Sequence, residues 1–281
     1  ILSGKFALWM SIIIKILYKR NTKLIGVLHG SELLPSNRRS IFLLKRSLIN
    51  LDAVISVSKF TDSLISDKIV DKSRRSIIAN GVNIKQFNIN DIVKNKKDLI
   101  GEPCLLTVGS ITNRKGQSNL INALPLILKH YPETHYHCIG IPIEGMQIIK
   151  LAKRLRVNKC LTLHGFIPND KLGVMYQQAD ILIMLSQSKI KYDVEGFGIA
   201  ILEANLFGVP ALGSLNTGIE DAIVNNQTGI LVNPYSINEI VEGIGLLFDT
   251  PDKFKIQTVK WAVEHGWDKI SKKYFKVIIN D

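Results

Sequence analysis

The organisation of this 281-residue chain follows from the stretch Asp193-Val194-Glu195-Gly196-Phe197-Gly198-Ile199-Ala200-Ile201-Leu202-Glu203-Ala204. A polar loop with Glu195 leads through Gly-Phe-Gly into an apolar segment, which predicts a helix that contains Glu203. Glycines at a helix start let a ligand approach the backbone, and the free N–H groups there attract anions. Glu203 lies among apolar residues, so its carboxylate needs a hydrogen-bond partner, which a polyhydroxylated ligand can supply. The alternative is two solvated glutamates beside a helix.

This stretch resembles the Glu-x7-Glu signature of the retaining glycosyltransferases of family 4, the group 1 glycosyltransferases. Gly208-Val209-Pro210 fits the continuation of the same block into a strand. The resemblance implies that Glu195 contacts the sugar of a nucleotide-sugar donor and that Glu203 contacts its ribose. Residues 196–198 belong to the same donor site.

The composition is that of a folded chain with unevenly placed charge. Hydrophobic residues make up 46% and charged residues 21%, which suits two domains with sizeable cores. The net charge is +12, and residues 1–100 carry 18 Lys and Arg against 7 Asp and Glu. A basic surface there suits an anionic partner such as a membrane or a phosphorylated lipid. We expect no nucleic acid, because no nucleic-acid-binding motif accompanies the charge; a generally lysine-rich proteome is the alternative explanation.

Cysteine usage and hydropathy bear on the compartment. Cys104, Cys138 and Cys160 lie in or beside apolar runs without metal-ligand spacing, which favours a reducing compartment. Residues 6–18 form the most hydrophobic run, which is shorter than the roughly 20 residues of a membrane span. We expect a core helix there, with an interfacial amphipathic helix as the alternative. The expected location is the cytoplasm, with peripheral contact at the inner face of the cytoplasmic membrane through the basic first domain.

Short apolar runs alternate with helical patterns along the whole chain. This alternation predicts an α/β fold with parallel sheets and right-handed crossovers. Strands are expected at 24–28, 53–58, 77–79, 105–109, 135–140, 161–165, 180–186, 210–213 and 228–232. Helices are expected at 6–18, 38–50, 58–68, 117–130, 169–178, 236–249, 252–265 and 267–279, besides those after residues 142 and 198.

The resemblance implies the arrangement called GT-B, in which two Rossmann-like domains face each other across a cleft. The acceptor-side domain is expected over residues 1–97 with the C-terminal helix 266–281. The donor-binding domain is expected over residues 98–265, after a polar linker at 85–97. The chain starts with Ile1, and we expect a fragment or a removed start. The first domain is expected to be truncated and to lack a Gly-rich loop of the acceptor side.

His29 is the first candidate site residue outside the central stretch. It follows the predicted strand 24–28 and precedes Gly30. Residues at the carboxyl ends of parallel strands face the ligand crevice of such folds. The resemblance implies that His29 approaches the donor sugar, whereas a lone histidine is otherwise as often structural.

A second candidate element follows the strand that ends at Gly109. The run Ser110-Ile111-Thr112-Asn113-Arg114-Lys115-Gly116 precedes a helix, and adjacent cations at a helix start suit a diphosphate. It is not a P-loop, because Arg114 stands where that motif requires its second glycine. The resemblance implies that Lys115 binds the donor diphosphate. Family members often carry an arginine where this chain has Ser110, so Arg114 is expected to supply that charge.

Two further features complete the expected donor site. The resemblance places the loop with Phe166 and Ile167 against the nucleotide base. His135 and His137 alternate on one strand, but no third ligand is evident, so we interpret them as structural. No Asp-x-Asp motif accompanies the cationic turn, and we expect no metal cofactor and a UDP- or GDP-sugar donor.

These residues predict an enzyme that moves a sugar from a nucleotide-diphosphate donor to a glycan or lipid-linked acceptor with retention. The expected catalytic residues are His29, Glu195, Lys115 and Arg114. Cell-envelope polysaccharide or lipopolysaccharide synthesis is the expected setting. The alternatives are a nucleotide-sugar-binding protein without transferase activity and a nucleotide-sugar epimerase of similar fold.

Overall fold

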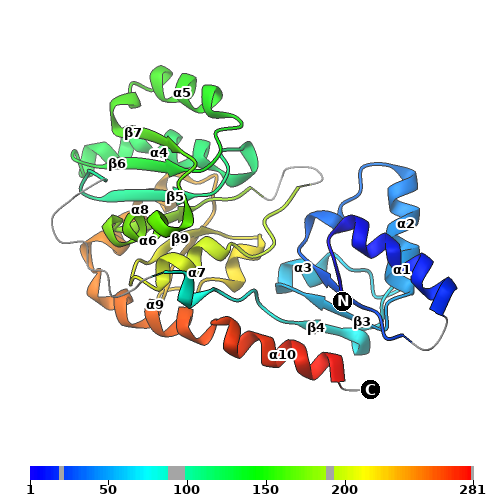
Figure 1. The fold of residues 1–281 in the computed structure, drawn as a ribbon. Helices are drawn as coiled ribbons and strands as arrows, with labels where there is room; N and C mark the ends of the chain where they lie inside the picture. Colours follow the sequence, from blue (N-terminus) through cyan, green and yellow to red (C-terminus); the bar gives the residue numbers. More distant parts are fainter. Residues whose placement is uncertain (19–21, 88–98, 188–192, 280–281) are drawn as a thin grey trace.

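The computed structural model describes residues 1–18, 22–87, 99–187 and 193–279 and contains two parallel β-sheets (Figure 1). The first sheet has the order β1-β2-β3-β4 and the second the order β10-β9-β8-β5-β6-β7. Every strand pairing in the described part is parallel. The predicted α/β class with two parallel sheets is therefore confirmed.

The first sheet is covered by short helices. Its strands are β1 (Leu2–Ser3), β2 (Ile25–Leu28), β3 (Ala53–Ser56) and β4 (Arg75–Ile77). Its helices are α1 (Lys5–Tyr18), α2 (Arg38–Ile49) and α3 (Lys59–Ser63). The side chains of Asn37 and Ser58 cap α2 and α3, each accepting a bond from a backbone N–H of the first turn.

The central strands of the second sheet are buried on both faces, which is why β5 and β8 are nearly continuous apolar runs. Its strands are β5 (Cys104–Val108), β6 (His135–Ile139), β7 (Leu161–Gly165), β8 (Ile181–Met184), β9 (Ala211–Ser214) and β10 (Gly229–Val232). The helices α4 (Gln117–His130), α5 (Gly145–Arg154) and α8 (Ile237–Asp249) share one apolar cluster with the sheet. The helices α6 (Asn169–Gln178), α7 (Ile199–Asn205) and α9 (Asp252–Glu264) contribute to the other.

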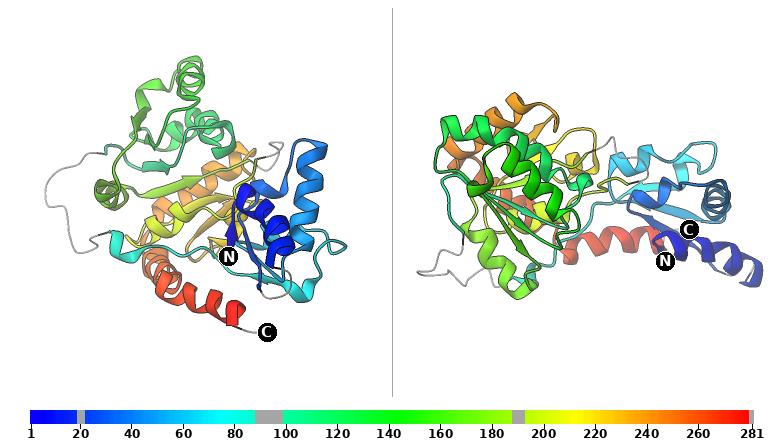
Figure 2. Two further views of the ribbon diagram at one scale, coloured as in Figure 1. Left: turned by 45° about the vertical axis from the view of Figure 1, so that its right-hand side comes forward. Right: turned by 90° about the horizontal axis from the view of Figure 1, so that it is seen from above.

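The cluster to which α6, α7 and α9 contribute also joins the two sheets. Val27 and Ile55 of the first sheet belong to the same buried cluster as Leu106 and Met184 of the second. The two sheets with their helices, which we call the first and the second unit, therefore share apolar packing. Figure 2 shows the two units side by side in two further views.

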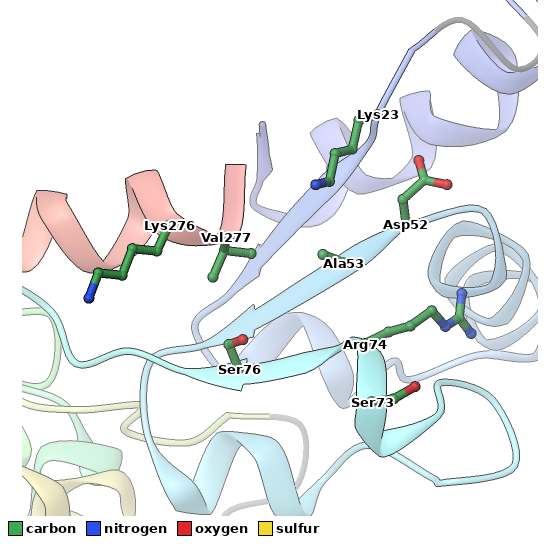
Figure 3. A pocket seen from close by; sticks show the side chains of 8 residues that line it. All are labelled: Lys23, Asp52, Ala53, Ser73, Arg74, Ser76, Lys276 and Val277. Carbon is green, nitrogen blue, oxygen red and sulfur yellow. The ribbon is translucent and has the colours of Figure 1, made fainter. Parts of the chain in front are cut away.

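The chain returns to the first sheet at its C-terminal end. Val82 donates a backbone hydrogen bond to His265 (2.9 Å) and accepts one from Trp267 (3.2 Å). Helix α10 (Trp267–Ile279) then runs beside the first sheet, and Lys23 Nζ donates to the Ile278 carbonyl at 3.4 Å. A cavity of about 440 Å³ lies between α10 and the starts of β3 and β4 (Figure 3). The expected domain boundary at 97/98 lies outside the described residues.

Two local predictions about the first sheet were wrong, and one strand was missed. Helix α3 ends at Ser63 instead of 68, because the chain turns at Leu64 to bury Ile65 and Val70. The third predicted strand lies at 75–77 rather than 77–79, and β1 was not foreseen.

The helix expected in the core lies on the surface. Leu8 and Ser11 are the buried residues of α1. A stripe of side chains on its other face is exposed, and we call these four residues the α1 stripe: Phe6, Met10, Ile13 and Leu17. The prediction of a core helix was therefore wrong. No helix in the part of the chain that the structure describes is both long and apolar enough to cross a membrane.

Candidate active site

The topology of the second sheet locates the site. The strand order reverses between β5 and β8, and ligands of such sheets bind at the carboxyl ends of the strands beside this point. The turn after β5 carries Arg114 and Lys115, and the loop with Glu195 follows β8. His29, directly after β2, faces that loop from the first sheet.

The glycines of the central stretch are required by close backbone contacts. A β-carbon at Gly196 would lie 1.8 Å from the carbonyl oxygen of His29, and one at Gly218 would lie 2.0 Å from that of Gly196. No other residue fits these positions without moving the backbone. The loop with Glu195 is therefore clamped between β2 and the turn that precedes Asp221.

A partly buried charge cluster occupies the centre of the site. Lys115 Nζ lies 2.6 Å from Glu195 Oε2, and Arg114 forms a second ion pair with the same oxygen. Arg114 Nε also donates to Asp193 at 2.8 Å. The side chains of Glu195 and Lys115 are only 13% and 14% exposed. Burial would raise the pKa of Glu195, but Lys115 and Arg114 outweigh it and hold this pKa below its ordinary value.

Two more glycines lie in or beside the cationic turn. A β-carbon at Gly116 (φ 73°) would overlap the Leu185 carbonyl at 1.7 Å, so this turn presses against the end of β8. Gly109 lies beside the Lys115 side chain, because a β-carbon there would be 3.5 Å from Lys115 Cε. The Ser110 carbonyl accepts a bond from Gln117 Nε2 at 3.2 Å. Arg114 and Lys115 thus both reach the crevice ahead of α4, the helix whose N-terminus follows them.

A cavity of about 330 Å³ lies against this cluster. His29, Val57 and Asn80 line it from the first unit, and Lys115, Glu195 and residues 196–200 line it from the second. His29 Nε2 lies 3.0 Å from Ser3 Oγ. Asn80, which is only 8% exposed, was not among the predicted site residues. Its place after β4 matches that of His29 after β2, and this signal could have identified it.

Glu203 lies one helical turn along α7 from the cavity. Ile199 and Ala200 line the cavity, and residues three and four positions further on share their helix face. Tyr176 of α6 donates to Glu203 Oε2 at 2.6 Å. Burial raises the pKa of Glu203, and the hydrogen bond from Tyr176 opposes this change.

The remaining predicted site residues are less closely associated with the cluster. Phe166 is 72% exposed, and Ile167 packs partly buried against the apolar cluster between the sheets. Neither residue lines the cavity. Asp221 bridges the two units, because its carboxylate accepts a hydrogen bond from the backbone N–H of Lys59 at 2.6 Å. Lys189 and Lys191 lie outside the described residues.

His135 and His137 pack with a third imidazole. His137 Nδ1 lies 2.9 Å from His164 Nε2, and His137 Nε2 lies 2.9 Å from the Ile100 carbonyl oxygen. Burial lowers the pKa of His137 to about 4, which favours neutral rings. Within the described ranges, no group of three or more His, Cys, Asp or Glu is placed to hold a metal ion.

Comparison with known proteins adds family and fold. Residues 88–258, more than half of the chain, match the family model described as glycosyl transferases group 1. A GDP-mannose-dependent alpha-(1-6)-phosphatidylinositol monomannoside mannosyltransferase of Mycolicibacterium smegmatis is 25% identical over 255 residues. That alignment covers 86% of this chain and 66% of the relative. The chain spans 62% of the counterpart from Mycobacterium tuberculosis.

Solved structures show the same fold. Sucrose-phosphate synthase from Thermosynechococcus elongatus superposes with a TM-score of 0.79 at 20% identity, over 98% of this chain and 71% of that one. Anabaena HepE in complex with UDP and glucose gives a TM-score of 0.80 at 17% identity, over 98% and 76%. The expected GT-B architecture is confirmed by these likenesses.

Proposed function

This chain belongs to the group 1 glycosyltransferases, and from that premise we propose that it transfers a sugar from a nucleotide-diphosphate donor to a hydroxyl acceptor. The observation that carries the proposal is the convergence of Arg114 and Lys115 on Glu195 at the carboxyl ends of β5 and β8. Two adjacent, poorly exposed cations beside a cavity suit the diphosphate of such a donor.

The proposed mechanism gives each side chain of the charge cluster a role in the transfer. As the bond between the sugar and the diphosphate breaks, negative charge grows on the leaving phosphate. Arg114 and Lys115 stabilise that charge, because they are held in a region of low solvent exposure. Glu195 orients hydroxyl groups of the sugar as a hydrogen-bond acceptor, and His29 contacts the sugar from the first unit. We propose that these side chains suffice without a metal ion.

The proposed donor is a UDP- or GDP-sugar. The relatives from Mycolicibacterium smegmatis and Mycobacterium tuberculosis are named for GDP-mannose, and the structurally similar HepE was solved with UDP and glucose. The proposed acceptor is a glycan or a lipid-linked glycan of the cell envelope, lipopolysaccharide included; the relative named for phosphatidylinositol monomannoside supports a lipid-linked acceptor. We further propose a retaining outcome and membership of family 4, which rest on the Glu195 and Glu203 spacing.

Nucleotide binding is the first test. A thermal-shift screen with UDP, GDP, ADP and dTDP, with and without EDTA, is expected to give a stabilisation with one base that EDTA does not remove. A shift that requires a divalent cation would contradict the metal-free mechanism. A chain that responds to none of the four nucleotides would contradict the donor site.

Transfer itself is tested with a matched pair of variants. Lys115→Ala is expected to reduce transfer from the identified donor at least a hundredfold, because it removes a cation that stabilises the leaving group. Lys150→Ala removes a cation from the exposed side of α5 and should leave the rate unchanged. Equal rates for Lys115→Ala and Lys150→Ala would overturn the role of Lys115. The anomeric configuration of the product, read by NMR, decides between retention and inversion.

The first unit is proposed to contact an anionic membrane at the cytoplasmic face. Support comes from the α1 stripe, which is exposed next to a strongly basic part of the chain. Apolar side chains and nearby cations together favour anionic lipid surfaces. Co-sedimentation with phosphatidylglycerol vesicles should exceed that with phosphatidylcholine vesicles and should fall in the Phe6→Ser/Leu17→Ser variant. Equal recovery with both lipids would contradict this contact.

A further inference from the structure

The second glutamate of the central stretch is held by a residue far away in sequence. Tyr176 on α6 is fully buried, and its hydroxyl donates to Glu203 Oε2 at 2.6 Å. Among the described residues, this is the hydrogen bond that fixes the Glu203 carboxylate. The terminal torsion of a glutamate side chain is otherwise broad, so one strong donor decides how the carboxylate is turned.

The position of Glu203 relative to the charge cluster sets what it can contact. Ile199 and Ala200, which line the cavity, lie on the same face of α7 one turn before Glu203. A helical turn rises about 5.4 Å, which is on the scale that separates a diphosphate from the ribose next to it. A donor whose diphosphate lies at Arg114 and Lys115 can therefore extend along α7 toward Glu203.

The chemistry of the pair leaves one carboxylate oxygen available. A tyrosine hydroxyl donates one hydrogen bond, whereas an ionised carboxylate accepts at both oxygens. Burial raises the pKa of Tyr176 far above its ordinary value, so this hydroxyl keeps its proton and remains a donor. Glu203 then has an oxygen free to accept hydrogen bonds from the vicinal hydroxyls of a ribose.

We propose that Tyr176 is a positioning residue, which turns Glu203 so that its carboxylate accepts the ribose hydroxyls of the nucleotide donor. The inference rests on the proposed donor function and on the ribose contact that the family resemblance implies for Glu203; the role of Tyr176 is what it adds. A site built to bind hydroxyl groups rejects analogues that lack them, because its polar atoms are then left without partners. Tyr176 therefore contributes to the selection of nucleotides with an intact ribose.

The test compares a nucleoside diphosphate with its 2′,3′-dideoxy analogue by calorimetry. The parent nucleotide is whichever of UDP, GDP or ADP binds best, since dTDP lacks the 2′-hydroxyl of a ribose. The wild-type chain should bind the parent at least tenfold more tightly than the analogue, and Tyr176→Phe should reduce that ratio about tenfold. Glu203→Gln should reduce the ratio as well, and adding Tyr176→Phe to it should change the ratio no further, because both changes act through one contact.

A packing control separates this role from a structural one. Phe207 stacks on Tyr176 with ring centroids 6.0 Å apart, so Phe207→Leu disturbs the same packing but spares the hydroxyl. It should lower the melting temperature and keep the ratio of parent to analogue. An unchanged ratio in Tyr176→Phe, or an equal fall in Phe207→Leu, would overturn the inference while leaving the donor function standing. A wild-type chain that binds no nucleotide would overturn the proposed function and this inference with it.

Discussion

Replacing Glu195 by glutamine is expected to lower stability and raise nucleotide affinity in the same variant. The carboxylate is shared by Lys115 and Arg114, and the three side chains are 13–21% exposed. Exposed ion pairs contribute below about 1 kcal/mol, whereas breaking a buried pair costs about 3–5 kcal/mol. For this intermediate exposure we expect a loss of about 1–3 kcal/mol in the free energy of unfolding.

The gain in affinity follows from the same contacts. In the wild-type chain, phosphate oxygens compete with Glu195 for two cations; in Glu195→Gln that competition is removed. The affinity for a nucleoside diphosphate should therefore rise about five- to a hundredfold, the equivalent of about 1–3 kcal/mol. Sugar transfer should nevertheless fall, because the acceptor of the sugar hydroxyls has lost its charge.

Urea unfolding and calorimetry measure the two effects. Glu264→Gln is the matched control, since Glu264 is 58% exposed and pairs with Lys269 outside the site. This control should change the free energy of unfolding by no more than about 0.5 kcal/mol, and it should leave the affinity for the nucleoside diphosphate unchanged. If Glu195→Gln binds the nucleotide no better than the wild-type chain, Glu195 does not compete for the cations, and the reasoning from the charge cluster is refuted.

Three further outcomes are expected. Gly196→Ala places a β-carbon 1.8 Å from the His29 carbonyl oxygen and should lower the free energy of unfolding in urea by more than about 2 kcal/mol. Its control is Gly165→Ala, where the space is open and only the positive φ disfavours a side chain, so this variant should lose only about 1 kcal/mol. Burial lowers the pKa of His137 to about 4, below the ordinary 6.5, so the contribution of its neutral ring to stability is complete above pH 6.5 and is lost as the pH falls toward 4. The melting temperature of the wild-type chain should therefore fall over that window, by the equivalent of about 3 kcal/mol in the free energy of unfolding. A flat profile would contradict the buried neutral ring. Asn80→Ala should lower kcat for transfer about tenfold with little change in the Kd of the nucleoside diphosphate, because Asn80 lines the cavity from the first unit; a parallel loss of nucleotide affinity would place it elsewhere.

Much of the second sheet could be predicted from the sequence. Its central strands, such as β5 and β8, are buried on both faces, so they are apolar runs bounded by turn residues. Helices such as 117–130 and 169–178 have the predicted bounds. The neighbourhood of Glu195, Arg114 and Lys115 also followed, because the carboxyl ends of adjacent parallel strands meet. The roles of these residues, and the division into donor and acceptor domains, stay predictions.

What the sequence could not show are contacts that depend on packing. Tyr176 and Glu203 meet because α6 and α7 lie side by side, and neither residue carries a local signal of the pair. The hydrophobicity of residues 6–18 predicted a helix, but it could not show that one face of this helix remains exposed. The base-contacting role expected of Phe166 has no support in its 72% exposure.

The central claim is that Arg114 and Lys115 bind the diphosphate of a nucleotide-sugar donor. Its most direct test is the calorimetric affinity of the preferred nucleoside diphosphate and of the same nucleoside without phosphates, in the wild-type chain and in Arg114→Ala/Lys115→Ala. We predict that the wild-type chain prefers the diphosphate at least a hundredfold and that the double variant binds both ligands within a few-fold of each other. A double variant that keeps the full preference for the diphosphate would contradict the account.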